Sequence, residues 1–243
     1  MLIVEIAMKG GEQKGLLAIW ADIEEDYRIE FEKWHNCEHV PERVNIPGFC
    51  VGHRYRGIGD APEVLMFYET LDSKTLGCEP YLHSLNNPTP WTRESISHFR
   101  NTVRTVYTLL ATSGKKPPTE APYLFVHRFD AEPGSERDVL RWYGKEYLSA
   151  VCGLPGVYRG RLYESDLETS NIMTEERKVL RPESGRQRFL AIYEVSSLDL
   201  GMGERWQRAS VETELRKSML KELIRGDREF YWHDFTMYAF ETD

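Results

Sequence analysis

The second half of this sequence repeats the landmark residues of the first half at the same spacing. Trp34 precedes Pro47 by 13 positions, and Trp142 precedes Pro155 by the same 13. The other matched positions are Glu38 and Glu146, Gly48 and Gly156, Tyr55 and Tyr163, and 67–69 and 192–194. Because chance rarely matches so many positions in one register, an internal duplication is the simplest explanation.

Each half shows the same order of expected elements: strand, helix, strand, strand, helix, strand. The expected strands are 16–21, 50–56, 64–69 and 102–110, then 123–129, 158–164, 189–195 and 235–240. The expected helical regions are 23–39, 73–99, 135–150 and 205–224. Pro41 is expected to end the first helix, because proline lacks the backbone N–H and restrains the residue before it. This order is that of the ferredoxin-like α+β unit.

Two such units in one chain can pair with each other. Helices cover one face of a ferredoxin-like sheet, and the other, apolar face must be buried against a partner. We therefore predict an α+β pseudo-dimer of tandem ferredoxin-like units, with units at 1–113 and 122–243 and a proline-containing linker at 114–121. The polar segment 165–188 is longer than its counterpart in the first half and predicts a flexible insertion or a lid.

Charge and composition exclude several classes of function. Lys and Arg number 31 against 39 Asp and Glu, a net charge of −8, and no basic run occurs, which disfavours nucleic acid and anionic membranes as partners. Met1–Gly11 lacks the charged start of a signal peptide, and no apolar run is long enough to span a bilayer. The four cysteines have no CxxC spacing, so we expect a protein of the reducing cytoplasm.

The residues best suited to chemistry gather around the first predicted helix and the strand after it. His35 and His39 are four positions apart and share a helix face, and the turn at Pro47 returns the chain with His53 and Arg54. Imidazoles titrate near neutral pH and a guanidinium can hold a carboxylate, so the set suits acid–base catalysis. We also include Tyr68, from the third strand, as a candidate site residue.

The second half serves as an internal control. It keeps the Trp, Glu, Pro-Gly and Tyr positions of the helix–turn–strand scaffold but not the titratable residues. In place of His35, His39, His53 and Arg54 it has Tyr143, Tyr147, Arg161 and Leu162. We therefore predict that the working site lies in the first copy alone.

Cofactor signals are weak. His35–His39 fits the H-x-x-E-H pattern of zinc proteases, but Pro41 follows directly and no convincing third ligand comes later in the chain. The run Gly57–Gly59 lacks the third glycine of a phosphate-binding loop. His127 or His233 could face a cavity, and a haem ligand there is an open alternative. The expectation is that no metal or cofactor is bound.

One segment carries a family resemblance. The run Glu38–Arg43, the turn Ile46–Phe49 and the strand start Gly52–Tyr55 together resemble the dimeric α/β barrel superfamily and, within it, the EthD-like proteins. The likeness extends to the topology of both halves but is specific only over about 34–55. It implies relatives among polyketide cyclases, muconolactone isomerases, small decarboxylases and monooxygenases, many without a cofactor, that work in a cavity between sheet and helices.

From the resemblance and the residues we expect a cofactor-independent lyase or isomerase that moves a proton on a small aromatic or cyclic acid. His39 or His53 would be the base, and Arg54 would anchor the anion. Two alternatives stay open: a module that binds a small ligand or responds to stress without turnover, and a haem- or metal-dependent oxidoreductase. The expected partner is a small-molecule substrate, and association into a homodimer also stays open.

Overall fold

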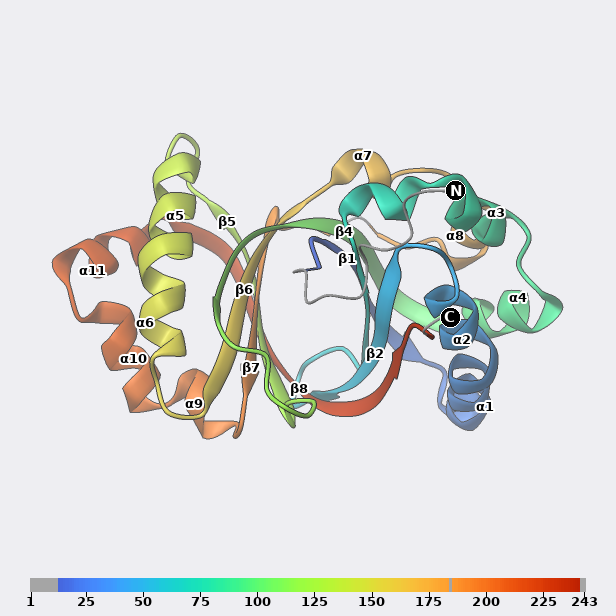
Figure 1. The fold of residues 1–243 in the computed structure, drawn as a ribbon, viewed down its shortest axis with the longest axis horizontal. Coiled ribbons are helices and arrows are strands. Elements are labelled where there is room, and N and C mark those ends of the chain that lie inside the picture. The colour runs from blue at the N-terminus through green and yellow to red at the C-terminus, as the bar shows by residue number, and fades with distance from the viewer. Residues whose placement is uncertain (1–12, 184, 241–243) are drawn as a thin grey trace.

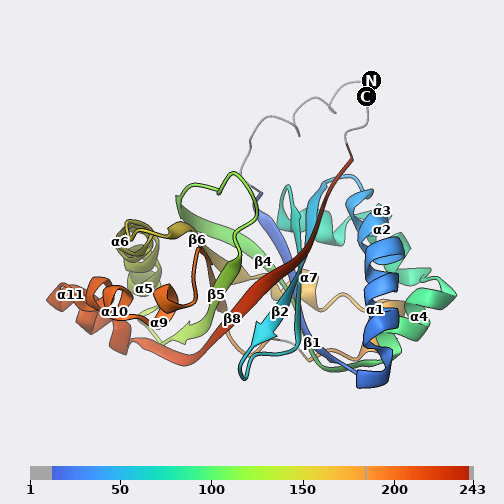
Figure 2. The ribbon, with the colours of Figure 1, turned by 90° about the horizontal axis from the view of Figure 1, so that it is seen from below.

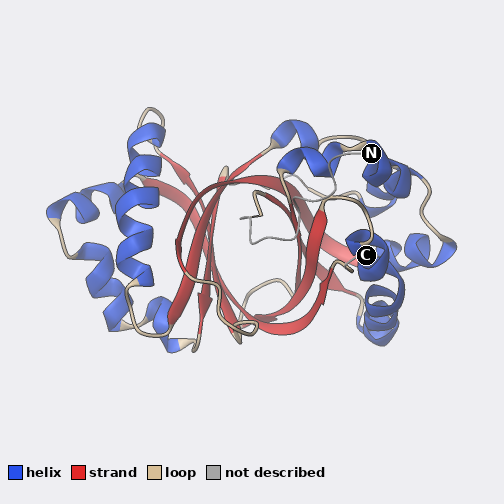
Figure 3. Cartoon of the chain, viewed as in Figure 1, coloured by secondary structure: helices blue, strands red, loops and turns tan. Residues whose placement is uncertain are grey.

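The strands close into a single barrel. The structure, a computed structural model, describes residues 13–183 and 185–240, and within them eight antiparallel strands follow the order β1-β3-β2-β8-β5-β7-β6-β4. The strands are β1 (Gly15–Ile23), β2 (Phe49–Ile58), β3 (Val64–Thr70), β4 (Phe99–Gly114), β5 (Tyr123–Ala131), β6 (Val157–Ser165), β7 (Phe189–Val195) and β8 (Leu223–Tyr238). Helices cover two opposite flanks of this barrel (Figure 1; Figure 3). The predicted α+β class with two ferredoxin-like halves is confirmed.

Two long strands join the halves. Each half has the sheet order of a ferredoxin-like unit, β4-β1-β3-β2 and β8-β5-β7-β6. The barrel closes where β2 pairs with β8 and where β4 pairs with β6. Strands β4 and β8 have 16 residues each, enough to pair within their own sheet and then with the other half. Figure 2 shows β8 crossing from the second half to lie beside β2.

The prediction of a strand only at 235–240 is therefore too short, and that of a helix to 224 runs too far. The charged stretch from Leu223 to Phe230 pairs with β5 as the first part of β8. Only 223–224 lie in the expected helix, and 225–234 lie in neither expected element. Three of the four charged residues of the stretch, Arg225, Asp227 and Arg228, are exposed.

The first helix of each half contains one wide turn. In the first half, α1 (Arg28–Trp34) continues through a π-helical turn (His35–His39) into α2 (Val40–Val44). In the second half, α5 (Glu136–Trp142) continues through Tyr143–Tyr147 into α6 (Leu148–Cys152). The expectation that Pro41 ends the helix is wrong: Val40 N–H bonds the carbonyl five residues back, and this wider turn accommodates the proline after it.

The segment between β6 and β7 belongs to the second half but packs on the first. It forms α7 (Leu167–Ser170) and α8 (Glu175–Leu180), which contact the helices and strand β4 of the first half (Figure 1). The other helices are α3 (Glu79–Asn86) and α4 (Pro90–Ser97) in the first half, and α9 (Asp199–Met202), α10 (Glu204–Val211) and α11 (Glu214–Lys221) in the second. The helix expected at 73–99 is thus two helices preceded by a 3-10 turn at 73–77. Another 3-10 turn, at 25–27, precedes α1.

Three apolar cores result. One lies between sheet and helices in each half, and the third fills the barrel with side chains from both halves. Because successive strand residues point to opposite faces, alternate residues of each strand pack in a helix-side core and in the barrel interior. Leu17 and Tyr68 belong to the first helix-side core, whereas Leu16 and Phe67 lie in the interior.

The barrel interior also holds a buried ionic cluster. Arg161 donates to Glu69 at 2.6 Å and to Glu194 at 3.3 Å, the two glutamates being equivalent positions of the two copies. His53 lies beside Glu69, with 3.8 Å between Nε2 and Oε1. Burial opposes ionisation of Glu69, but the charges of Arg161, His53 and Arg159 outweigh it and lower its pKa to about 2.

The part that the structure describes contains no helix long and apolar enough to cross a membrane. The expectation that the chain starts without a signal peptide rests on Met1–Gly11, which lies outside the described residues.

Matched glycines allow the helices to approach the sheets. A Cβ on Gly52 would lie 2.9 Å from Val40 Cγ1, and one on Gly160 would lie 2.9 Å from Leu148 Cδ2. We expect Gly52→Ala and Gly160→Ala each to lower the free energy of unfolding by about 1–3 kcal/mol, because overpacked contacts force side chains or backbone to shift. Urea denaturation measures this. Gly153→Ala, where the nearest atom would be 3.4 Å away, is the control with little effect, and equal costs at all three positions would contradict the prediction.

The ionic cluster predicts a pH dependence of stability. Since the pKa of Glu69 falls from its ordinary value of 4.5 to about 2 on folding, its contribution is complete above about pH 4.5 and is lost as the pH falls toward 2. We expect the free energy of unfolding of the native protein to drop, relative to Glu69→Gln, by about 3 kcal/mol over that range. The exposed Glu146→Gln is the control that should follow the native curve. A constant difference between native and Glu69→Gln would refute this assignment.

Candidate active site

Four of the five predicted site residues meet on the helix side of the first sheet. His35 and His39 project from the π-helical turn, while Arg54 and Tyr68 project from β2 and β3 toward it. His53 does not join them. It is next to Arg54 on one strand, so it points to the opposite face and lies in the barrel interior beside Glu69. The structure therefore brings His39 and Arg54 to the same side of the sheet but not His53.

A chain of hydrogen bonds fixes the protonation of His35. Asp234 accepts from Arg54 Nε at 2.6 Å, and Arg54 Nη1 lies 3.2 Å from His35 Nδ1. A guanidinium can only donate, so Nδ1 accepts and the ring proton is on Nε2. Nε2 then donates to the Tyr68 hydroxyl at 3.2 Å. Burial, and next the charge of Arg54, lower the pKa of His35 well below its usual range, which keeps it neutral.

This chain leaves the Tyr68 hydroxyl hydrogen free to donate elsewhere. The hydroxyl oxygen already accepts from His35, and burial raises the pKa of the phenol well above its usual value. Tyr68 therefore stays protonated at neutral pH. Its ring lies 6.0 Å from the ring of His39, between centroids, and both side chains line the same cavity.

His39 is the buried group best placed to accept a proton. Its ring packs on Trp34, with 4.4 Å between centroids, and its Nδ1 has no hydrogen-bond partner among the described residues. Burial, followed by the charge of Arg43, lowers its pKa well below the usual range. The imidazole is therefore neutral and keeps a lone pair.

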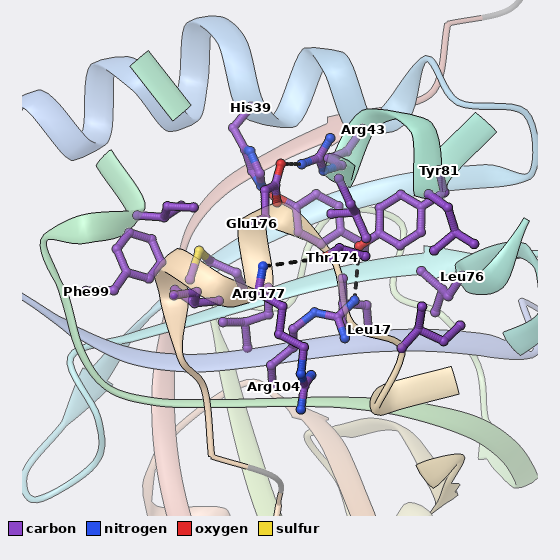
Figure 4. A pocket seen from close by; sticks show the side chains of 18 of the residues that line it. Leu17, His39, Arg43, Leu76, Tyr81, Phe99, Arg104, Thr174, Glu176 and Arg177 are labelled. Atoms are coloured by element: carbon purple, nitrogen blue, oxygen red, sulfur yellow. Dashed lines mark hydrogen bonds and ion pairs between the residues drawn. The ribbon is translucent and has the colours of Figure 1, made fainter. Parts of the chain in front are cut away.

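The cavity beside His39 is small and closed by the inserted segment. Its volume is about 40 Å³, whereas a cavity that holds a benzene ring measures about 150 Å³. Arg43 from the helix pairs with Glu176 of α8 at 2.5 Å, and Arg104 of β4 donates to Tyr81. Figure 4 shows these side chains around one hollow, with Arg177 across from His39. The inserted segment, predicted as a flexible insertion or a lid, thus packs over the other copy's cavity.

The sequence reasoning missed the charged lining of this cavity. Arg43 stood at the end of the conspicuous run 34–43 without being chosen, and Arg104 reads as one residue of a β-strand. Glu176 and Arg177 lie in the insertion, and no local sequence pattern indicates which surface the insertion contacts. The one available signal was that the insertion carries an acidic residue able to pair with a buried arginine.

The equivalent space in the second copy is larger and more aromatic. Its volume is about 430 Å³, and its polar lining includes the hydroxyls of three tyrosines and Ser210 together with His127 and Arg228. The Tyr143 and Tyr193 hydroxyls are 2.8 Å apart, in the positions that His35 and Tyr68 occupy in the first copy. Tyr147, which replaces His39, bonds Ser210 at 3.0 Å. The two copies thus keep one geometry but differ in chemistry.

Three residues that the sequence suggested as metal or haem ligands, His35, Glu38 and His127, have other neighbours in the structure. In the H-x-x-E-H run both nitrogens of His35 are engaged, and Glu38 accepts from Thr89 and Thr92 instead of facing the histidines. Of the haem candidates, His127 lines the larger cavity, but its Nε2 would lie 3.1 Å from a Cβ on Gly226 and so faces the β8 backbone.

No family model matches the chain, and no curated protein matches its sequence. Among solved structures, an anthrone oxidase-like protein matches with TM-score 0.65 and 12% identity over 95% of both chains. A protein of Lactobacillus acidophilus NCFM assigned as a monooxygenase matches with TM-score 0.57 and 10% identity, over 93% of this chain and 97% of that one. Chlorite dismutase from Candidatus Nitrospira defluvii matches with TM-score 0.58 and 11% identity over 93% of each.

These neighbours are mostly enzymes, and their likeness spans both halves of the chain together with the junction between them. At 10–12% identity it concerns the fold alone. The chain shares the fold of these structures, a closed barrel of the dimeric α/β type, built here from two fused ferredoxin-like halves.

Proposed function

We propose that the chain is an enzyme that removes a proton from a small aromatic or cyclic acid in the first-copy cavity. The observation that carries the proposal is the pairing of an unpartnered, neutral imidazole with a phenol whose hydrogen is free. His39 and Tyr68 supply these groups to the same closed space. Proton abstraction next to a carbonyl needs at least a base and a hydrogen-bond donor that face the same small cavity.

In this proposal His39 is the base. A depressed pKa makes an imidazole a weak base, but an anionic substrate beside it favours the charged imidazolium and raises its pKa on binding. The proton leaves the substrate carbon as negative charge develops on the adjoining oxygen. Tyr68 donates to that oxygen, and a donor fixed in a dry site stabilises such charge strongly.

Arginines at the cavity suit an anionic substrate. Arg43 is almost fully buried and is paired with Glu176, a carboxylate that the lid supplies. A substrate carboxylate can take the place of Glu176 when the lid segment moves aside. This segment must move before an aromatic substrate can enter, because the closed cavity is smaller than a benzene ring needs. Arg54, predicted as the anchor, instead holds His35 in one orientation.

The resemblance of the 34–55 segment to the EthD-like proteins supports a cofactor-independent reaction of this type. The solved neighbours, however, favour a different outcome after deprotonation: one is an anthrone oxidase-like protein and others are assigned as monooxygenases. A second candidate is therefore oxygenation. The carbanion formed by His39 would react with O2, so that a CH2 group and O2 give a carbonyl and one water.

Replacing the proposed base tests the common first step. We expect His39→Gln to slow deuterium uptake from D2O into a responsive member of a panel of aromatic and alicyclic carboxylic acids by about 10²–10⁴-fold. NMR follows the exchange, and the melting temperature of the same variant reports folding. The matched control is Tyr147→Phe, because Tyr147 occupies the equivalent position in the second copy. Loss of exchange in Tyr147→Phe with normal exchange in His39→Gln would move the site to the second cavity.

An oxygen electrode separates the two candidates. If the chain is an oxygenase, one O2 is consumed for each substrate converted, and His39→Gln abolishes the consumption. If it is a lyase or isomerase, product forms at the same rate without oxygen. Saturable binding of the panel compounds without exchange, conversion or oxygen uptake would refute the enzyme proposal and support the binding-module alternative.

A further inference from the structure

The seam between β2 and β8 carries a second cluster of ligating side chains, on the interior side of the sheet. His53 of β2, His233 of β8 and Glu120, in the linker between the copies, each present one ligand atom, and these atoms lie within 4.8 Å of one another. The cluster is separate from the proposed active site, because His53 points away from His39 across the sheet. It combines residues of the first copy, the linker and the second copy.

A β-bulge creates this cluster. Tyr55 is opposite His233 and Arg54 is opposite Phe235, which leaves Asp234 as an extra residue in β8. Residues three apart on a regular strand face opposite sides, but across the bulge His233 and Thr236 face the same side. Asp234 itself reaches Arg54 on the helix side.

The two imidazoles aim at one point. His53 Nδ1 and His233 Nε2 each lie 2.7 Å from the same oxygen, Thr236 Oγ1. Glu120 Oε2 is 3.8 Å from His53 Nδ1. The hydroxyl oxygen of Thr236 thus lies where both imidazoles could reach an ion, and a bound ion would displace this oxygen or take it as a further ligand.

We propose that His53, His233 and Glu120 bind a divalent transition-metal ion that fastens the linker to the barrel. Two imidazoles and one carboxylate suit Zn²⁺ or Fe²⁺ and disfavour Mg²⁺ and Ca²⁺, which prefer oxygen ligands. Three protein ligands leave coordination positions for Thr236, water or a small ligand. This reverses the expectation from the sequence of no bound metal, which considered only the local H-x-x-E-H run.

The surroundings support metal binding at His53. Its other nitrogen, Nε2, lies 3.8 Å from Glu69 Oε1, and Glu69 is held by Arg161 at 2.6 Å. At 3.8 Å this carboxylate is beyond hydrogen-bond distance, so it favours a cation at His53 through its charge alone. Lys116 lies 3.9 Å from Glu120 and opposes a cation, but its side chain is 45% exposed and can turn to solvent.

Cobalt and zinc provide the test. After chelator treatment of the full chain, we expect one Co²⁺ per chain to bind, with visible d–d absorption, and Zn²⁺ to displace it with micromolar or tighter affinity. Mg²⁺ should not compete. His233→Ala and Glu120→Gln should each weaken Zn²⁺ binding by at least tenfold. Both residues are only partly buried, so these variants are expected to fold, and circular dichroism checks this.

The controls separate this site from other histidines and from the proposed function. His83→Ala removes an exposed histidine and should bind Co²⁺ like the native protein, as should His39→Gln. Zn²⁺ should raise the melting temperature of the native chain and of His39→Gln, but not of His233→Ala. The proposal would be overturned if one Co²⁺ per chain did not bind at a concentration about 100-fold below millimolar with Mg²⁺ present. Unchanged Zn²⁺ affinity in both ligand variants would also overturn it. Neither result depends on whether His39 catalyses exchange.

Discussion

Closure of two sheets around one shared interior is the constraint on which this molecule depends. Each ferredoxin-like sheet alone would have an exposed apolar face and two edges with unpaired backbone groups. Pairing β2 with β8 and β4 with β6 satisfies both requirements at once. Both faces of the strands are then largely covered, one by helices and one by the interior, so a polar group on either face needs a partner. Adjacent residues such as His53 and Arg54 consequently serve different environments.

Much of the architecture could be predicted from the sequence, because duplication makes each half a check on the other. The matched Trp34 and Trp142, with their fixed distance to a Pro-Gly turn, located the helix–turn–strand scaffold correctly. The misplacement of His53 was avoidable, since strand alternation alone puts His53 and Arg54 on opposite faces.

Other features could not be predicted from local patterns. The π-helical turn at His35–His39 widens the helix without a distinctive sequence, and it carries Pro41 where proline normally ends a helix. The bulge at Asp234 depends on how β8 pairs with β2, 180 positions away in the chain. The contact of Glu176 with Arg43 likewise joins segments 133 positions apart. In each case, tertiary contacts override the local conformational propensity of the sequence.

The two helix-side cavities show how far identical scaffolds can diverge. The first is small, charged and covered, and the second is larger, aromatic and rich in hydroxyls. Tyr193 keeps the position of Tyr68, while Tyr143 stands in place of His35. A hydrogen-bonded imidazole–phenol pair in one copy corresponds to a hydrogen-bonded pair of phenols in the other, 3.2 Å apart in the first and 2.8 Å apart in the second.

The crossing of α7 and α8 onto the other copy has a consequence for the history of the chain. In a homodimer of identical subunits, rotational symmetry would make any such arm cover both cavities alike, and every change in one pocket would appear in the other. Covalent fusion removes that symmetry. Once each half has a fixed identity, a single arm can be lengthened on one side only, and the two pockets become free to evolve under separate selection.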